Sequence, residues 1–282
     1  MQYHGKSIDT FEDAVTMLFL NRGYDIFPHI DCISLRCFVF QVNKQDWKNW
    51  LVPVMDHKSA VNRLFSFCGL MEYMKLECEK DALWKMMEYG CLVGPVSERK
   101  PYGIYSLYYD GYKKYLYVCG KKNGLFVVHD PDGFPMRLLK KEDFENYYDL
   151  SRAIAVTLEE GGNLIKEIDY LQVLRAGLNY RKKIENKESI DAWSWVICGK
   201  VNRFQNISVV NGLYNYLLQI CKIICLSENM GSSWSSEMDK LNMVIKELYR
   251  CVVLGDIKQF CQLKEEIFIG LEKIAGLRAE VE

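Results

Sequence analysis

The chain has few of the residues that mark several common classes of protein. Histidine occurs only four times in 282 residues and never after His129, so the second half offers no imidazole for catalysis or metal binding. There are six prolines, and no low-complexity tract suggests extended disorder. No apolar run approaches the roughly 18 residues that a membrane-spanning helix needs.

Charge of one sign is not in excess either. The formal net charge is −1; residues 1–150 carry 19 basic and 20 acidic side chains, and residues 151–282 carry 17 of each. Proteins that bind nucleic acids or anionic membranes usually show a basic excess. We therefore expect neither a nucleic-acid nor a membrane partner.

The first ten residues lack the basic-then-apolar order of a signal peptide, so we expect a cytoplasmic protein. Its eleven cysteines are then expected to be reduced thiols and not a disulfide framework. Cys221 and Cys225 are one helical turn apart and could bind a metal, but their apolar neighbours favour a buried helix. The usual phosphate, dinucleotide, zinc-protease and nucleophile-elbow motifs are absent, and we expect no cofactor and no metal.

The clearest local pattern is a β-hairpin near the middle of the chain. Residues 115–119 and 125–129 are aromatic and β-branched runs, and they are separated by a loop that begins and ends with Gly120 and Gly124. Pro131 stops the second run because proline cannot continue a central strand. The pattern predicts two antiparallel strands.

The rest of the first half reads as helices followed by a sheet. Further strands are expected around residues 94–96 and 104–109, and residues 136–139 lead into a short helix at residues 141–148. Beyond about residue 150, apolar residues recur at helical spacing, notably over residues 241–252 and 257–274. We predict an α+β fold with two domains, residues 1–150 with helices and an antiparallel sheet and residues 151–282 mostly helical.

Three segments together resemble a known family. They are a cysteine that begins a predicted helix at residues 31–36, the Val-Gly-Pro-Val stretch at residues 93–96, and the His-Asp-Pro-Asp-Gly-Phe-Pro stretch at residues 129–135. Over roughly residues 20 to 150 the chain resembles the peptidase-like N-terminal domain of butirosin biosynthesis protein H and its relatives. The resemblance implies a papain-like cysteine-peptidase fold followed by a helical region, and a place in acyl transfer in bacterial natural-product biosynthesis.

The resemblance assigns roles to individual residues. Cys32 matches the nucleophile of the family, Asp130 matches the acid that orients the catalytic histidine, and Lys114 stands where that histidine belongs. Gly120 and Asp130 follow Lys114 by six and sixteen residues, the distances at which they follow the histidine in the family. The usual His-Cys pair has become Asp31-Cys32, and His29 is a conceivable substitute for the missing imidazole.

The loss of the histidine bears on mechanism. An imidazole beside a cysteine promotes thiolate formation and returns a proton to the leaving group. Lysine is normally protonated near neutral pH, so Lys114 could stabilise a thiolate or an oxyanion but would not accept a proton. An ion pair between Lys114 and Asp130 could be structural or catalytic, Cys32 could be a nucleophile or a small buried residue, and His129 fits packing better than general-base catalysis.

Two functions follow from this reading. In the first, Cys32 takes an acyl group from a carrier protein as a thioester and passes it to a small-molecule amine. In the second, the papain-like fold is catalytically degenerate and binds a peptide, a carrier protein or another partner. A cluster of tyrosines could line the binding cleft or pack against the sheet; it consists of Tyr102, Tyr105, Tyr108, Tyr109, Tyr112, Tyr115 and Tyr117.

Overall fold

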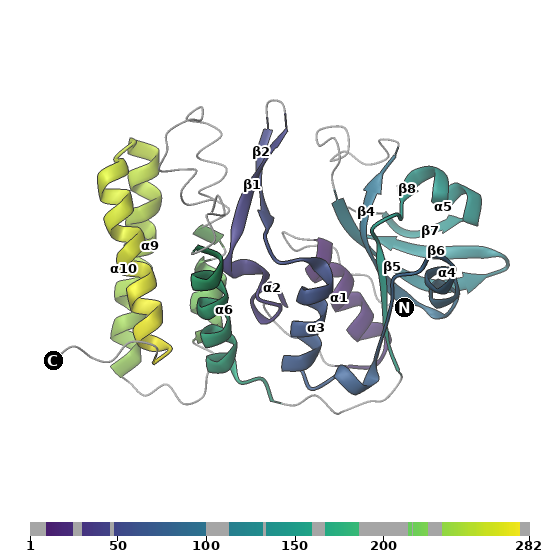
Figure 1. The fold of residues 1–282 in the computed structure, drawn as a ribbon, viewed down its shortest axis with the longest axis horizontal. Helices are drawn as coiled ribbons and strands as arrows, with labels where there is room; N and C mark the ends of the chain where they lie inside the picture. The colour runs from purple at the N-terminus through teal and green to yellow at the C-terminus, as the bar shows by residue number, and fades with distance from the viewer. Residues whose placement is uncertain are drawn as a thin grey trace. The chain divides into compact units, whose positions relative to one another are not determined.

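The structure is a computed structural model in which residues 10–24, 30–45, 48–99, 113–131, 134–159, 167–185, 214–215, 217–224 and 233–276 are described. The chain forms two compact units, and both are discontinuous in sequence. Unit 1 comprises Met1–Ile30 and Leu64–Glu167, and unit 2 comprises Asp31–Arg63 and Ile168–Glu282. Figure 1 labels many of their helices and strands.

Unit 1 is built on a seven-stranded antiparallel sheet. Its main path runs in the order β3–β9–β4–β5–β6–β7, and β8 pairs with β4. The strands are β3 (Met74–Glu77), β4 (Cys91–Glu98), β5 (Lys113–Lys122), β6 (Leu125–Asp130), β7 (Phe134–Leu139), β8 (Tyr148–Asp149) and β9 (Ile154–Leu158). The helices are α1 (Thr10–Asn21), the 3-10 helix η2 (Met71–Tyr73), α4 (Lys80–Tyr89) and α5 (Lys141–Tyr147).

The predicted hairpin is confirmed as β5 and β6, but its turn is tighter than the expected glycine-flanked loop. Asn123 and Gly124 alone form the turn, with φ angles of 50° and 79°. Two successive positive φ angles are typical of the type I′ turn that matches the twist of paired strands. Gly120, with φ 133°, lies at a register shift within β5, so it serves a β-bulge and not the loop.

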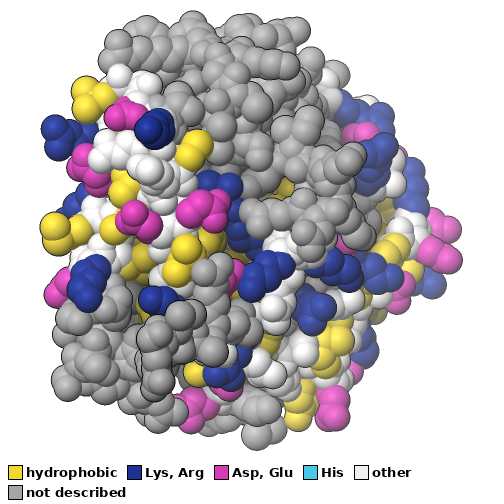
Figure 2. All heavy atoms as spheres, turned by 60° about the vertical axis from the view of Figure 1, so that its left-hand side comes forward, with side chains coloured by type: hydrophobic (Ala, Val, Ile, Leu, Met, Phe, Trp, Pro, Cys, Tyr) yellow, Lys and Arg dark blue, Asp and Glu magenta, His cyan; other side chains and the backbone are white. Residues whose placement is uncertain are grey.

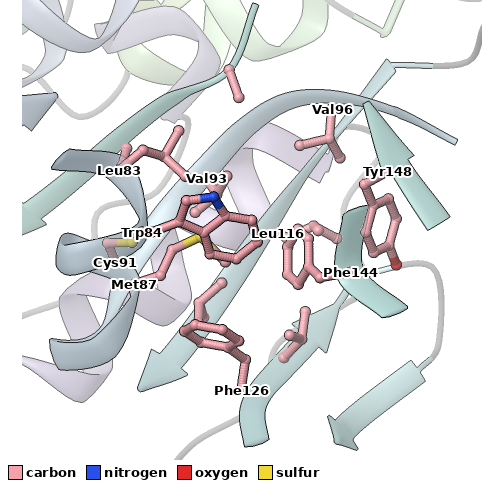
Figure 3. Close-up of a cluster of buried hydrophobic side chains, with 14 of the residues drawn as sticks. Leu83, Trp84, Met87, Cys91, Val93, Val96, Leu116, Phe126, Phe144 and Tyr148 are labelled. Atoms are coloured by element: carbon pink, nitrogen blue, oxygen red, sulfur yellow. The ribbon is translucent and has the colours of Figure 1, made fainter. Parts of the chain in front are cut away.

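A cluster of apolar side chains covers one face of this sheet (Figure 3). Trp84 of α4 and Phe144 of α5 lie with their ring centroids 5.6 Å apart, and Trp84 also packs on Phe126 at 5.4 Å. On the opposite face, Phe11 of α1 makes an edge contact with Tyr115, with centroids 4.9 Å apart. Both faces of the sheet are therefore covered by helices.

Unit 2 combines a two-stranded hairpin with helices. Its elements are α2 (Ile30–Ile33, whose first residue belongs to unit 1), the 3-10 helix η1 (Arg36–Phe38), β1 (Phe40–Gln45), β2 (Lys48–Pro53), α3 (His57–Phe67, which continues into unit 1), α6 (Tyr170–Glu185), α9 (Ser233–Leu254) and α10 (Ile257–Ile274). Residues 217–224 are also helical. Helices α9 and α10 pack against each other, and the Asp256 carboxylate caps α10 by accepting from the Gln259 N–H at 3.0 Å.

The predicted α+β class, the antiparallel sheet and the helical C-terminal region are all confirmed. Strand β9 and the β1–β2 hairpin were not predicted from the sequence, and the strand expected at residues 104–109 lies outside the described residues. The sheet of unit 1 continues past residue 150 through β9, which lies between β3 and β4. The domain boundary after residue 150 stays a prediction.

Charged side chains of both signs lie near one another on the face drawn in Figure 2. This mixture agrees with the near-neutral formal charge of the chain. Within the described residues, every helix is too short or too polar to cross a lipid bilayer.

Candidate functional site

The predicted Lys114 and Asp130 lie on the core-facing side of the unit 1 sheet. Side chains alternate along a strand, so Lys114 shares a face with Leu116 of β5, and Asp130 shares a face with Val128 of β6. Leu116 and Val128 both belong to the buried apolar cluster. The side chains of Lys114 and Asp130 are 1% and 0% exposed. The alternation that builds the core thus places both charged groups inside the protein.

The Lys114 ammonium group has two carboxylate partners. Its Nζ donates to Asp130 Oδ2 at 2.6 Å, and it also donates to Oε1 of Glu98 at the end of β4. The Glu98 side chain is only 4% exposed. A lysine buried between two carboxylates forms charge-assisted hydrogen bonds with little competition from water.

Arg137 and Tyr148 complete the network on the other side of Asp130. Arg137 Nη1 lies 3.5 Å from Asp130 Oδ2 and donates to the Tyr148 hydroxyl, which donates in turn to Asp130 Oδ2 at 3.2 Å. The strand register accounts for this meeting, because Val128 pairs with Arg137 and Glu98 pairs with Tyr148. Among the described residues, the network thus joins two cations, Lys114 and Arg137, to two carboxylates, Glu98 and Asp130.

Tyr148 joins the charged network to the apolar core. Its ring packs on Phe144 with centroids 5.0 Å apart, and Figure 3 shows the ring at the margin of the apolar cluster. Burial first, and then the negative charge of Asp130, raise the pKa of Tyr148 well above its ordinary value of 10. The hydroxyl therefore stays protonated and donates a hydrogen bond to the Asp130 carboxylate.

The contacts of His129 agree with the packing role that the sequence favoured. It lies next to Asp130 in β6, and its Nδ1 accepts a hydrogen bond from the Met136 N–H at 3.1 Å. The imidazole stacks on Tyr117 at a centroid distance of 6.3 Å and an interplanar angle of 7°. Burial lowers the pKa of His129 below 6.5, which favours the neutral ring.

Cys32 lies in unit 2, in the single-turn helix α2. Its side chain is buried, Cys37 Sγ donates to it at a sulfur–sulfur distance of 3.1 Å, and it donates to Gln219 Oε1 at 3.9 Å. The preceding residue, Asp31, is also buried and pairs with Arg36 Nη1 at 3.1 Å. Cys37 and Gln219 both belong to unit 2, as Cys32 does.

The structure brings together two of the four predicted site residues. Lys114 and Asp130 form the predicted ion pair. Cys32 belongs to the other unit, so the arrangement of Cys32 with this pair stays a prediction, and His29 lies outside the described residues.

Sequence reasoning missed Glu98, Arg137 and Tyr148. Alternation along β4 was the available signal for Glu98, since Glu98 follows the core residue Val96 by two positions. No local pattern indicates that Arg137 and Tyr148 meet at Asp130, because the strand pairing determines their approach.

The predicted tyrosine cluster lies only partly within the described residues. Tyr115 and Tyr117 are buried and pack against neighbouring aromatic rings, while the other five tyrosines lie outside the described residues. Among described residues, no group of three histidine, cysteine or acidic side chains is placed to bind a metal ion. Cys221 is buried in the helical residues 217–224, in agreement with the buried helix favoured there, and Cys225 lies outside the described residues.

Comparison with known proteins adds no relative. No protein-family model matches the chain, and no curated protein matches it. The resemblance over roughly residues 20 to 150 therefore stays a prediction.

Proposed function

We propose that this chain is a catalytically degenerate, papain-like protein of the butirosin biosynthesis protein H type, which binds an acyl carrier protein without transferring the acyl group itself. The observation that carries the proposal is the bonding of Lys114, which donates to both Glu98 and Asp130. By the resemblance, Lys114 stands where the active relatives carry their catalytic base.

The bonding of Lys114 argues against proton transfer. A cysteine acyltransferase needs a group that takes the proton of the attacking thiol and later returns it to the thiol that leaves. An ammonium group has three donors and no acceptor. Lys114 holds its ammonium between two buried carboxylates, in a network whose formal charges cancel. Loss of a general base typically costs a factor of about 10² to 10⁴ in rate.

The surroundings of Cys32 support the same conclusion. A nucleophilic thiol must reach the carbonyl carbon of its substrate, but the Cys32 side chain is 0% exposed. It contacts Cys37 and Gln219, and the neighbouring Asp31 carboxylate is paired with Arg36. Buried cysteines of this kind usually serve as small apolar residues.

The choice of a carrier protein as the bound partner rests on the resemblance to proteins of acyl transfer. The competing function is the acyltransferase, in which Cys32 would carry the acyl group to a small-molecule amine. Its support is the retention of Cys32 and Asp130 at the positions that match the family. The two functions differ in one observable, a covalent acyl group on Cys32.

The test measures acylation and binding side by side. The full chain is incubated with a phosphopantetheinylated acyl carrier protein of the same organism, loaded with an acyl group, and separately with an acyl thioester of N-acetylcysteamine. Peptide mass spectrometry should find no more acylation at Cys32 than at the exposed Cys78. Isothermal titration calorimetry should show saturable binding of the carrier protein. Cys32→Ala should change the dissociation constant by no more than about twofold, because the buried thiol does not take part in carrier binding.

Two results would overturn this proposal. Selective acylation of Cys32, discharged by a small amine such as hydroxylamine and abolished in Cys32→Ala, would establish the acyltransferase instead. An absence of both acylation and carrier binding would remove the carrier protein as the partner.

A further inference from the structure

In unit 2, two cysteines flank a tight turn. Cys32 lies in α2 and Cys37 lies in η1. Between them Leu35 adopts a left-handed conformation with φ 65°, and its N–H donates to the Cys32 carbonyl oxygen at 2.9 Å. This conformation reverses the chain and brings the start of η1 back toward α2.

Two contacts with the same spacing span this turn. The Asp31 carboxylate pairs with Arg36 five residues later at 3.1 Å, and Cys37 Sγ lies 3.1 Å from Cys32 Sγ, also five residues apart. All four side chains are buried. The ion pair therefore helps to hold the backbone in the conformation that places the two sulfur atoms together.

The sulfur–sulfur distance is about 1 Å longer than the bond of a disulfide, which is about 2.05 Å. We propose that Cys32 and Cys37 form a reversible redox site, in which an intramolecular disulfide closes the turn between α2 and η1. The site is independent of the proposed carrier-protein function, because it rests on the geometry of this turn alone.

The reaction is a thiol–disulfide exchange with a low-molecular-weight disulfide as the oxidant. Both thiols are buried, so the exchange takes place during transient local opening of the turn. In the opened chain one cysteine, as its thiolate, attacks a sulfur atom of the oxidant, which releases the first thiol and leaves a mixed disulfide. The second cysteine loses its proton and attacks the protein sulfur of that mixed disulfide, which releases the second thiol. In total two cysteine thiols lose two electrons and two protons, and one molecule of oxidant becomes two thiols.

Oxidation would alter the contacts of unit 2 in a defined way. The Cys32 S–H donates to Gln219 Oε1 at 3.9 Å, and this contact ends when the proton leaves. A disulfide also prevents the turn from opening in the unfolded chain, so folding and disulfide formation favour each other.

The experiment exploits Arg36, which lies between the two cysteines. The full chain is equilibrated with mixtures of oxidised and reduced glutathione, from both the reduced and the oxidised side. Exchange is stopped with N-ethylmaleimide before the protein is denatured and digested with trypsin. A disulfide then appears as residues 23–36 linked to residues 37–44, two hydrogen atoms lighter than the sum of the two peptides.

For each state of the chain we compare the ratio of oxidised to reduced glutathione at which half of the protein is oxidised. We expect this ratio to be at least about tenfold lower for the folded chain than for the same chain unfolded in urea. Cys32→Ser and Cys37→Ser should each abolish the linked peptides. Cys68→Ser is the matched control and should leave them unchanged, since burial raises the pKa of the Cys68 thiol to about 12 and Cys68 lies outside this turn. An equal or higher ratio for the folded wild-type chain would overturn the proposal.

Discussion

At the scale of single residues, Lys114 has more partners than the sequence predicted. The expected ion pair with Asp130 is present, but Glu98 shares the same ammonium group, and Arg137 and Tyr148 share Asp130. Burial makes each member of this network depend on the others, because an unbalanced charge in the core has no water to solvate it. We therefore expect the network to contribute to the stability of unit 1.

Removal of one charge should therefore be costly. We expect Lys114→Met to lower the free energy of unfolding by about 3–5 kcal/mol, because the buried carboxylates of Glu98 and Asp130 would lose the ammonium group that they share. Lys114→Met/Glu98→Gln restores the balance of charge and should recover more than about 1 kcal/mol of that loss. Urea denaturation of both variants measures these differences.

The matched control for this cycle is the exposed pair of Lys80 and Glu145, whose side chains are 67% and 37% exposed. Lys80→Met should change the free energy of unfolding by less than about 1 kcal/mol. If Lys114→Met has an equally small effect, the network does not stabilise the fold and the structural interpretation of Lys114 is wrong.

His129 should make stability depend on pH. Its pKa is lowered from 6.5 by burial, so above pH 6.5 the ring is neutral in both the folded and the unfolded chain. Below that value the unfolded chain takes up a proton that the folded chain does not. The free energy of unfolding should therefore fall by up to about 1.4 kcal/mol per pH unit between 6.5 and the lower pKa of the folded state.

Urea denaturation at about pH 7.5 and about pH 5.5 measures this contribution. His129→Gln is the control, because the glutamine carbonyl can accept from Met136 N–H but does not titrate. Wild type should lose more stability than His129→Gln on acidification. The same loss in both proteins would show that His129 does not contribute.

At the scale of elements, two glycines in helices of unit 2 differ in the space available for a Cβ atom. A Cβ atom on Gly177 of α6 would lie 2.4 Å from the Phe38 ring of η1, whereas a Cβ atom on Gly270 of α10 would meet Leu241 Cδ1 at 3.4 Å. The first distance is a clash and the second is an ordinary contact. The glycine in α6 therefore allows η1 to pack close to the helix.

Substitution by alanine should separate the two positions. Gly177→Ala should destabilise the chain by about 1–3 kcal/mol because the Phe38 ring must move. Gly270→Ala should stabilise it by about 0.5–1 kcal/mol, since alanine loses less backbone entropy in a helix. Thermal and urea unfolding of the two variants give the sign of each change, and stabilisation by Gly177→Ala would contradict the close packing of η1 on α6.

Elements with a local signal could be predicted from the sequence. The hairpin of β5 and β6 follows from two aromatic and β-branched runs joined by a glycine-containing loop, and the helix α10 follows from helical periodicity. Strand β9 is a five-residue apolar run whose partners, β3 and β4, lie far away in the sequence, so only the folded sheet identifies it. The helix expected to begin near Cys32 is a single turn because Leu35 takes a positive φ, a conformation that leucine seldom adopts.

At the scale of the whole molecule, the candidate site residues are divided between the two units. Lys114 and Asp130 belong to the sheet of unit 1, and Cys32 belongs to the turn of unit 2. The resemblance predicted the ion pair, because it matches Lys114 and Asp130 to two residues that interact in the family. The partners that neutralise it come from β4, β7 and β8, and sequence spacing alone carries no information on such pairings.

The most direct test of the central claim, that Cys32 is not an activated nucleophile, is the pH dependence of iodoacetamide labelling in the intact chain. Trypsin separates Cys32 from Cys37, so mass spectrometry can follow Cys32 alone and compare it with the exposed Cys78. The account predicts that Cys32 is labelled more slowly than Cys78 at every pH. Rapid labelling of Cys32 with a midpoint well below about pH 8 would reveal an activated thiolate and contradict it.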